Sequence, residues 1–215
     1  NITITNCVLH SRDSALKIGT ETHGTIRNVT LSDCIIDRCS RAVGIWVRDG
    51  GTVEDIHIHH LTGSTLRYAD RYAEPGAPGW WGKGEPIFIS ATPRKNSRTK
   101  TGTIRNVTFD NLSITCESCA FLAGEPESCL RDIRIRALHM TFKRQGTQPG
   151  GLFDEQPSVR HVYSHAIPAL NARSVKQLTV QDSTVRYADK SEAWASEVTT
   201  LEDCTESAVD LKKIQ

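Results

Sequence analysis

One pattern of alternating residues recurs along the chain and limits its fold more than any other feature. The copies are NITITNC at 1, IRNVTLSDC at 26, VEDIHIHHL at 53, IRNVTFDNL at 104, LRDIRIRAL at 130 and VKQLTVQDS at 175. Each alternates apolar and polar side chains and ends, or nearly ends, in Asn or Asp followed by Cys or Leu. This pattern is typical of a half-buried β-strand that runs into a turn.

The spacing of the copies predicts how the strands are arranged. Equivalent positions are separated by 27, 27, 51, 26 and 45 residues, and they are Asn1, Asn28, Asp55, Asn106, Asp132 and Gln177. About 26 residues therefore form one unit, and the two long gaps hold insertions near 66–100 and 144–170. Repeated strands without intervening helices fit a solenoid. We predict an all-β, right-handed parallel β-helix of about six to eight coils, forming a single domain over residues 1–215.

Stacking of the coils would align equivalent side chains in inward ladders. The first ladder is Val29, Ile56, Val107, Ile133 and Leu178, and the second is Leu31, Ile58, Phe109, Ile135 and Val180. His57 falls in the alternating column that faces solvent, so we interpret HIHH at 57–60 as a solvated strand face and predict no metal site. Cys7 and Cys34 share a column with leucines and are expected to be buried small apolar residues.

A second strand follows each of the first three copies, in SALKIGTETHG, AVGIWVRDGG and GEPIFISATPR. The inward positions there are Leu16, Ile18, Ile45, Val47, Ile87 and Ile89. Lys17, Trp46 and Arg48 are then expected to point out on one surface. The strand ends carry acids, namely Asp13, Glu21, Asp49 and Glu85. Acids, cations and aromatic rings on one face suit a saccharide site, although ordinary solvated strand ends are the simpler interpretation.

Two adjacent tryptophans stand in GWWGKG, at the end of the longer insertion and just before a second strand. Trp80 and Trp81 cannot both face the same way in an extended segment. We expect one ring to hold the insertion against the β-helix and the other to border a cleft beside Lys83 and Glu85.

Charge and cysteine content exclude several classes of protein. The formal net charge of +1 offers no electrostatic basis for binding nucleic acid or an anionic membrane, and no apolar run approaches the roughly 20 residues that span a bilayer. Seven cysteines are spread along the chain. CESC at 116–119 lacks the further ligands that zinc needs, so a local disulfide between Cys119 and Cys129, or plain thiols, are the favoured alternatives.

At the second strands the chain resembles the polygalacturonase-type glycoside hydrolases of family 28, which are right-handed parallel β-helices. SALKIGTETHGTIRNVTLSDC followed by GIWVRDGGTVEDIHIHHL is similar to the stretch from that family's G-H-G…I-G-S motif to its R-I-K motif. WWGKGEPIFISATPR is similar to a bacterial branch of uncertain substrate. The likeness covers most of the chain and is strongest from residue 1 to about 112.

The chain departs from that family at the motifs that carry the chemistry. The N-T-D and D-D motifs that supply the family's catalytic aspartates are absent, and their coils are expected upstream of Asn1, which would make this a truncated chain. Residues 13–15 stand at the G-H-G position, so a serine replaces the histidine. Residues 44–46 stand at the R-I-K position, so the cationic pair that grips a galacturonate carboxylate is missing. The cations that could compensate are Lys17, Arg48 and Lys83.

The resemblance implies inverting hydrolysis of O-glycosidic bonds in a polysaccharide, with an acid and a base about 6.5–9.5 Å apart. If the chain is complete, Asp13 and Asp49 are the candidate pair, expected one coil apart, at a coil spacing of about 4.8 Å. The candidate substrate-binding residues are Lys17, Glu21, Trp46, Arg48, Trp80, Trp81, Lys83 and Glu85. A neutral sugar stacked on Trp46 is as compatible with these residues as a uronate.

Two alternatives remain open. A non-catalytic carbohydrate-binding or adhesive β-helix needs no carboxyl pair. A polysaccharide lyase would use a Lys or Arg base and often Ca²⁺, but no single strand carries three or four acids to hold calcium. The expected partner is a polysaccharide or oligosaccharide, with no cofactor, and a secreted or periplasmic location is favoured over a cytoplasmic one.

Overall fold

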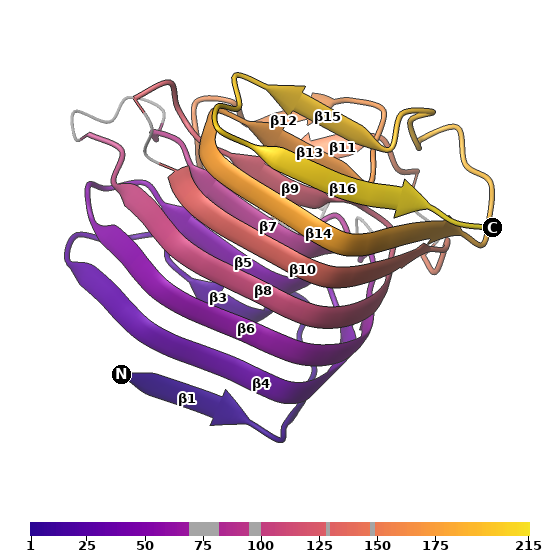
Figure 1. The fold of residues 1–215 in the computed structure, drawn as a ribbon, viewed down its shortest axis with the longest axis horizontal. Coiled ribbons are helices and arrows are strands. Elements are labelled where there is room, and N and C mark those ends of the chain that lie inside the picture. Colours follow the sequence, from indigo (N-terminus) through magenta and orange to yellow (C-terminus); the bar gives the residue numbers. More distant parts are fainter. Residues whose placement is uncertain (69–81, 95–99, 128–129, 147–148) are drawn as a thin grey trace, which may run out of the picture.

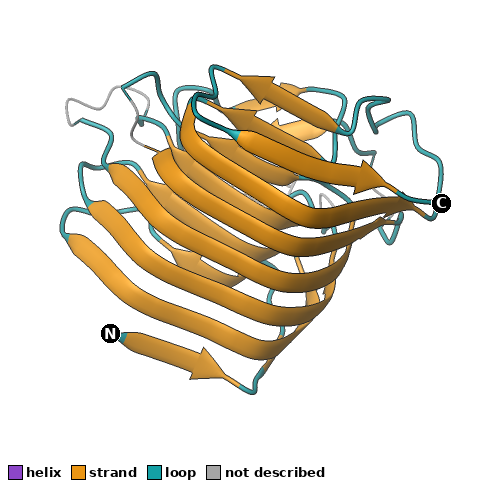
Figure 2. Ribbon diagram, viewed as in Figure 1, coloured by secondary structure: helices purple, strands orange, loops and turns teal. Residues whose placement is uncertain are grey.

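The computed structural model describes residues 1–68, 82–94, 100–127, 130–146 and 149–215. The structure is all-β, with two long sheets of stacked parallel strands and one antiparallel strand pair (Figures 1 and 2). Within these ranges there is no helix long and apolar enough to cross a membrane. The chain passes from one long sheet to the other and back, an arrangement consistent with a parallel β-helix.

The first sheet forms the face seen in Figure 1, where its strands stack in chain order from the N-terminus to the C-terminus. These strands are β1 (Ile2–Thr5), β4 (Thr25–Cys39), β6 (Thr52–Thr65), β8 (Thr103–Cys116), β10 (Leu130–Phe142), β14 (Val175–Tyr187) and β16 (Ala208–Lys213), with the short β2 (Val8–Leu9) beside β4.

The second sheet lies behind the first in Figure 1 and also follows chain order. Its strands are β3 (Ser14–Ile18), β5 (Arg41–Val47), β7 (Glu85–Ala91), β9 (Ala120–Ala123), β13 (Leu170–Arg173) and β15 (Thr199–Glu202). The antiparallel pair, β11 (Leu152–Asp154) and β12 (Val162–Ser164), belongs to the second insertion.

The register of the first sheet confirms the predicted ladders. Val29 pairs with Ile56, which pairs with Val107, and the same column continues through Ile133 to Leu178. All five side chains are buried between the sheets. The predicted outward position of His57 is also confirmed, because its side chain is exposed. Of the two cysteines expected to be buried, Cys34 is, whereas Cys7 is only half-buried in the outermost strand pair.

Each long strand of the first sheet bends at single residues in the left-handed conformation. In β4 the residues with positive φ are Asn28 (57°), Asp33 (54°) and Arg38 (53°). Each inserts one extra residue into the alternation of inward and outward side chains. Leu31 and Cys34 are therefore both buried although they are three positions apart and not two. Asn and Asp adopt this conformation more readily than most residues. The predicted turn after each strand is therefore a one-residue bend, and the strand continues beyond it.

The bends recur at the same place in successive strands. The Asn28 column has positive φ throughout, at Asp55 (56°), Asn106 (51°), Asp132 (54°) and Gln177 (59°). Side chains of this column also bond to one another across strands: the Asn28 amide donates to Asn1 Oδ1 at 2.8 Å, and the Asn106 amide donates to Asp55 Oδ1 at 2.6 Å. The Asn and Asp residues that define the repeat are thus conformational requirements of the bend.

Gln177 is a suitable position for testing this requirement. Its side chain is exposed, so a substitution there changes mainly how readily the backbone adopts positive φ. We expect Gln177→Gly to be at least as stable as the native chain, since glycine has no Cβ to clash at positive φ. Gln177→Val should be less stable than the glycine variant by about 1–2 kcal/mol. Thermal unfolding followed by circular dichroism measures both; a valine variant that matches the glycine variant would contradict the bend.

Candidate functional site

The outward face of the second sheet is covered by the second insertion. Phe153 of β11 packs on Phe121 of β9 with ring centroids 4.9 Å apart, and Arg48 reaches the backbone of residues 155 and 157. The sequence predicted an open face with Lys17, Trp46 and Arg48 on one surface. Lys17 is exposed, but Trp46 is only 2% exposed and Arg48 is 0% exposed. The expectation of an open face was wrong because Phe153 and the backbone of residues 155 and 157, from the insertion between β10 and β13, lie over it.

Aromatic side chains form a second core between this insertion and the sheet. Trp46, Phe88 and Phe121 follow one another with ring centroids 5.0 Å apart at each step. The Trp46 ring lies over Gly44, where a Cβ atom would stand 2.3 Å from the ring. Glycine at position 44 is therefore what allows the indole to lie flat on the sheet. A sugar cannot stack on the face of this buried ring, which removes the stacking role predicted for Trp46.

Arg48 is a structural residue beneath the insertion. Its guanidinium donates hydrogen bonds to three carbonyl oxygens, those of Ser90 (2.8 Å), Glu155 (2.9 Å) and Pro157 (2.9 Å). Burial lowers the pKa of Arg48 to about 10, which still leaves it charged at neutral pH. Since each of its three nitrogens donates a hydrogen bond and no exposed surface remains, Arg48 holds the insertion in place and is not available to a substrate.

The predicted residues Lys83 and Glu85 both form buried ion pairs, and that of Lys83 is with the insertion. Lys83 Nζ lies 3.1 Å from the Asp154 carboxylate, and Arg41 Nε lies 3.3 Å from the Glu85 carboxylate. Burial raises the pKa of Glu85, and the nearby Arg41 and Lys83 oppose that shift. Neither Lys83 nor Glu85 borders open solvent as a cleft residue would. Trp80 and Trp81, predicted beside them, lie outside the described residues.

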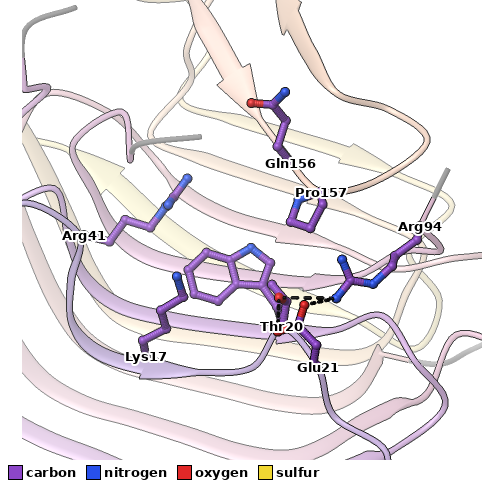
Figure 3. Close-up of a pocket in the computed structure, with 8 residues that line it drawn as sticks. Lys17, Thr20, Glu21, Arg41, Arg94, Gln156 and Pro157 are labelled. Carbon is purple, nitrogen blue, oxygen red and sulfur yellow. Dashed lines mark hydrogen bonds and ion pairs between the residues drawn. The ribbon is translucent and has the colours of Figure 1, made fainter. Parts of the chain in front are cut away.

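An open pocket remains at the β3–β5 end of this face, beyond the edge of the insertion. Its volume is about 300 Å³, and it is lined by Lys17, Thr20, Glu21, Arg41, Trp46, Arg94, Gln156 and Pro157. In Figure 3, Lys17 and Arg41 stand on one side, Arg94 on the other, and Gln156 and Pro157 above. β3 supplies Lys17, β5 supplies Arg41, the segment after β7 supplies Arg94, and the second insertion supplies the roof.

Glu21, which lines this pocket, and the nearby Asp13 and Asp49 are each paired with a cation. Asp13 accepts a hydrogen bond from Lys17 Nζ at 2.7 Å. Arg94 bridges two acids, at 2.7 Å from Asp49 Oδ1 and 2.6 Å from Glu21 Oε1. Burial acts to raise the pKa of Glu21, but hydrogen bonds from Thr20 and Arg94 outweigh it and lower that pKa. With its pKa lowered in this way, the Glu21 carboxyl is suited to pairing with Arg94 rather than to donating a proton.

The buried ring of Trp46 leaves one donor at the pocket without a partner. Its indole N–H is buried and has no hydrogen-bond acceptor among the described residues. A buried donor that lacks an acceptor is costly, and it is often satisfied by a ligand or an ordered water. Trp46 therefore contributes an N–H group to the lining, not an aromatic platform.

The two aspartates predicted as a catalytic pair lie at opposite ends of two neighbouring strands of the second sheet, β3 and β5. Asp13 immediately precedes β3 and sits beside Ser40, whose N–H donates to the Asp13 carbonyl at 2.9 Å. Asp49 follows the far end of β5, so the length of that strand, roughly 20 Å at about 3.3 Å per residue, separates them. The prediction that they stand side by side in neighbouring coils was wrong, and they cannot serve one glycosidic bond as a pair.

Sequence reasoning missed five of the eight residues that line the pocket, and two of these, Arg41 and Arg94, are cations. Arg41 opens β5 and is buried beneath the Trp46 ring, with its guanidinium 5.1 Å from the ring centroid. Arg94 follows β7 in ATPR, a position that the repeat did not distinguish from a loop. Both are cations at or just beyond the ends of second strands, where the sequence already places candidate acids. Their position could therefore have marked them as candidate site residues.

The cysteine motif has no metal-binding geometry in the described structure. Cys116 and Cys119 are free and fully buried, and burial raises the pKa of each thiol. They therefore behave as plain core thiols, while Cys129 lies outside the described residues.

Comparison of the chain with models of known protein families, with characterised proteins and with solved structures gives no match.

Replacing Arg48 tests its structural role. Arg48→Met keeps most of the side-chain volume but leaves three carbonyl groups without a donor, so we expect a loss of about 2–4 kcal/mol in the free energy of unfolding. Lys17→Met, on the same outward face but exposed, is the matched control and should cost at most about 1 kcal/mol. Equal losses in both variants, measured by chemical denaturation, would contradict the assignment of Arg48.

Proposed function

We propose that the two parallel sheets form a right-handed parallel β-helix. In the described part, seven strands stack along the first sheet, at a regular register and with repeated one-residue bends. This agrees with six to eight coils, each contributing one strand to each sheet.

We further propose that the protein is a polygalacturonase-like glycoside hydrolase that binds an acidic polysaccharide. The pocket lined by the cations Lys17 and Arg94, with Arg41 buried at its base and paired with Glu85, is the observation that supports this proposal. A uronate carboxylate is matched in size and charge to such a group, because guanidinium groups bind carboxylates through paired hydrogen bonds. The partly exposed Lys17–Asp13 and Arg94–Glu21 pairs can open at little cost, which frees Lys17 Nζ and the side of Arg94 that faces Glu21, while Arg94 keeps its pair with Asp49.

The pocket also offers groups for the uncharged parts of a sugar. The Trp46 N–H is an unpaired donor, and the Gln156 side chain carries both a donor and an acceptor. Hydroxyl groups can act as acceptors for the first and as either partner for the second. A sugar ring would then lie across the pocket edge-on to Trp46, with its carboxylate toward the cations.

Inverting hydrolysis requires an acid and a base that flank the glycosidic bond. Asp13 and Asp49 lie too far apart to flank one bond, and hydrogen bonds from Thr20 and Arg94 lower the pKa of Glu21, which makes it a poor proton donor. We therefore assign this pocket to substrate binding and withdraw Asp13 and Asp49 as the catalytic pair. Under this proposal the proton donor is a carboxyl outside this pocket.

The paired acids favour one alternative function. A carbohydrate-binding β-helix without catalytic activity would need the same cations and no carboxyl of raised pKa. The two functions predict the same ligand and differ only in whether the glycosidic bond is cleaved.

Incubation with polygalacturonate and with a neutral galactan tests the proposal. We expect binding of the acidic polymer only, by isothermal titration calorimetry, together with new reducing ends and no unsaturated product absorbing in the ultraviolet. Binding without reducing ends would support the carbohydrate-binding alternative, and an unsaturated product would indicate a lyase. Absence of binding to either polymer would overturn the pocket assignment.

Variants of the pocket separate charge from hydrogen bonding. Lys17→Gln and Arg94→Gln should each weaken binding of the acidic polymer about tenfold or more, because each removes a charge-assisted contact worth about 1.5–3 kcal/mol. Trp46→Phe keeps a ring and removes only the N–H, so a smaller loss is expected. Lys212→Gln, an exposed cation on β16 that pairs with Asp210, is the control and should bind like the native protein. A loss in Lys212→Gln equal to that in Lys17→Gln would show nonspecific charge attraction.

A further inference from the structure

Two adjacent histidines of the first sheet point toward each other. His59 and His60 have their Nδ1 atoms 2.9 Å apart, and their ring centroids are 5.0 Å apart and nearly perpendicular. Neighbouring residues of a regular strand point to opposite faces. Here His60 has a φ of 54°, so the alternation is interrupted and both rings emerge on the same outer surface.

The parallel stacking brings a carboxylate to this histidine pair. Asp33 occupies the same bend position one strand earlier, with a φ of 54°, and its Oδ1 lies 3.6 Å from His60 Nδ1. The ligand atoms of Asp33, His59 and His60 all lie within 4.8 Å of one another. The Asp33 and His60 side chains are 51% and 52% exposed, so solvent and ions can reach the group.

The distances fit a metal ion with few adjustments. Zinc binds imidazole nitrogen at about 2.0–2.1 Å and carboxylate oxygen at about 2.0–2.2 Å, which puts tetrahedral ligand atoms roughly 3.3 Å apart. The two observed separations, 2.9 Å and 3.6 Å, lie on either side of that value. One Nδ1 must carry the hydrogen that the two rings now share. With that hydrogen moved to Nε2 of the same ring, both Nδ1 lone pairs are available to a cation.

A further acid on the next strand lies near these three residues but is paired with an arginine. Asp110 lies in register with His59, one strand further along the sheet. Its carboxylate accepts a hydrogen bond from Arg136 Nε at 3.0 Å, so it is already engaged and is a neighbour of the site, not a ligand.

We propose that Asp33, His59 and His60 form a surface site for a divalent transition-metal ion of the zinc type, completed by water. Two imidazoles and one carboxylate favour such an ion over Mg²⁺ or Ca²⁺, which prefer sets of oxygen ligands. The site joins β4 to β6, and it belongs to the first sheet, whereas the pocket belongs to the second. Metal binding should therefore stabilise the stack of strands and leave saccharide binding unchanged.

Zinc titration of protein without a histidine tag tests the site. Isothermal titration calorimetry with ZnCl₂ should show one saturable site in the native chain, and zinc should raise the melting temperature where Mg²⁺ does not. His60→Asn is the informative variant, since asparagine occupies the same bend at position 111 with a φ of 57°. It removes the imidazole and keeps a residue that suits the backbone, so the protein should fold normally and bind zinc at least about tenfold more weakly.

His57→Asn is the matched control, because His57 lies on the same strand, is exposed and does not belong to the group. It should bind zinc within about twofold of the native chain. Electron paramagnetic resonance of the Cu²⁺-loaded protein should show coordination by two nitrogens, reduced to one in His60→Asn. Equal losses in the two variants, or no saturable zinc binding by the native chain, would overturn the proposal.

Discussion

Parallel hydrogen bonding in constant register is the constraint from which the other features follow. Val29 pairs with Ile56, and Ile56 with Val107, so each residue stands directly above its equivalent in the preceding repeat. An apolar residue in one copy is thereby buried against apolar residues in the next. The same register brings the Asn28 amide to Asn1, and Asp33 to His60, because polar residues stack as strictly as apolar ones.

The left-handed bends allow long strands to follow a closed core. A strand of strict alternation would remain straight, and its inward face would leave the core after a few residues. One residue at positive φ, such as Asp33, turns the strand and restores an inward position to the next apolar side chain. The bend also places neighbouring side chains on one surface, which is how His59 and His60 meet. The positive φ that the bend requires at His60 thus also brings together the two imidazoles of the proposed metal site.

The covering of the second sheet decides which of its side chains can meet a ligand. Trp46 and Arg48 point away from the inner core, as alternation requires, yet the second insertion buries both. Lys17 and Arg94 remain accessible because Gln156 and Pro157 of the insertion stand at the rim of the pocket and do not fill it. The proposed saccharide site therefore lies at an edge of this cover, where Lys17 and Arg94 meet the inserted segment.

The sequence alone determined the repeat, the inward ladders and the register, because each rests on local alternation that is repeated at a constant spacing. It also marked the bend residues, since Asn28, Asp55 and Asn106 are of the types that tolerate positive φ. Which outward side chains of the second sheet are buried and which are exposed was decided only by tertiary structure. The bond from Arg48 to the Pro157 carbonyl joins residues 109 positions apart, and nothing in the periodicity of β5 indicates that a distant segment will cover it. The separation of Asp13 from Asp49, by contrast, was available from the sequence, because Asp13 precedes one second strand, Asp49 follows the next, and parallel strands put these positions at opposite strand ends.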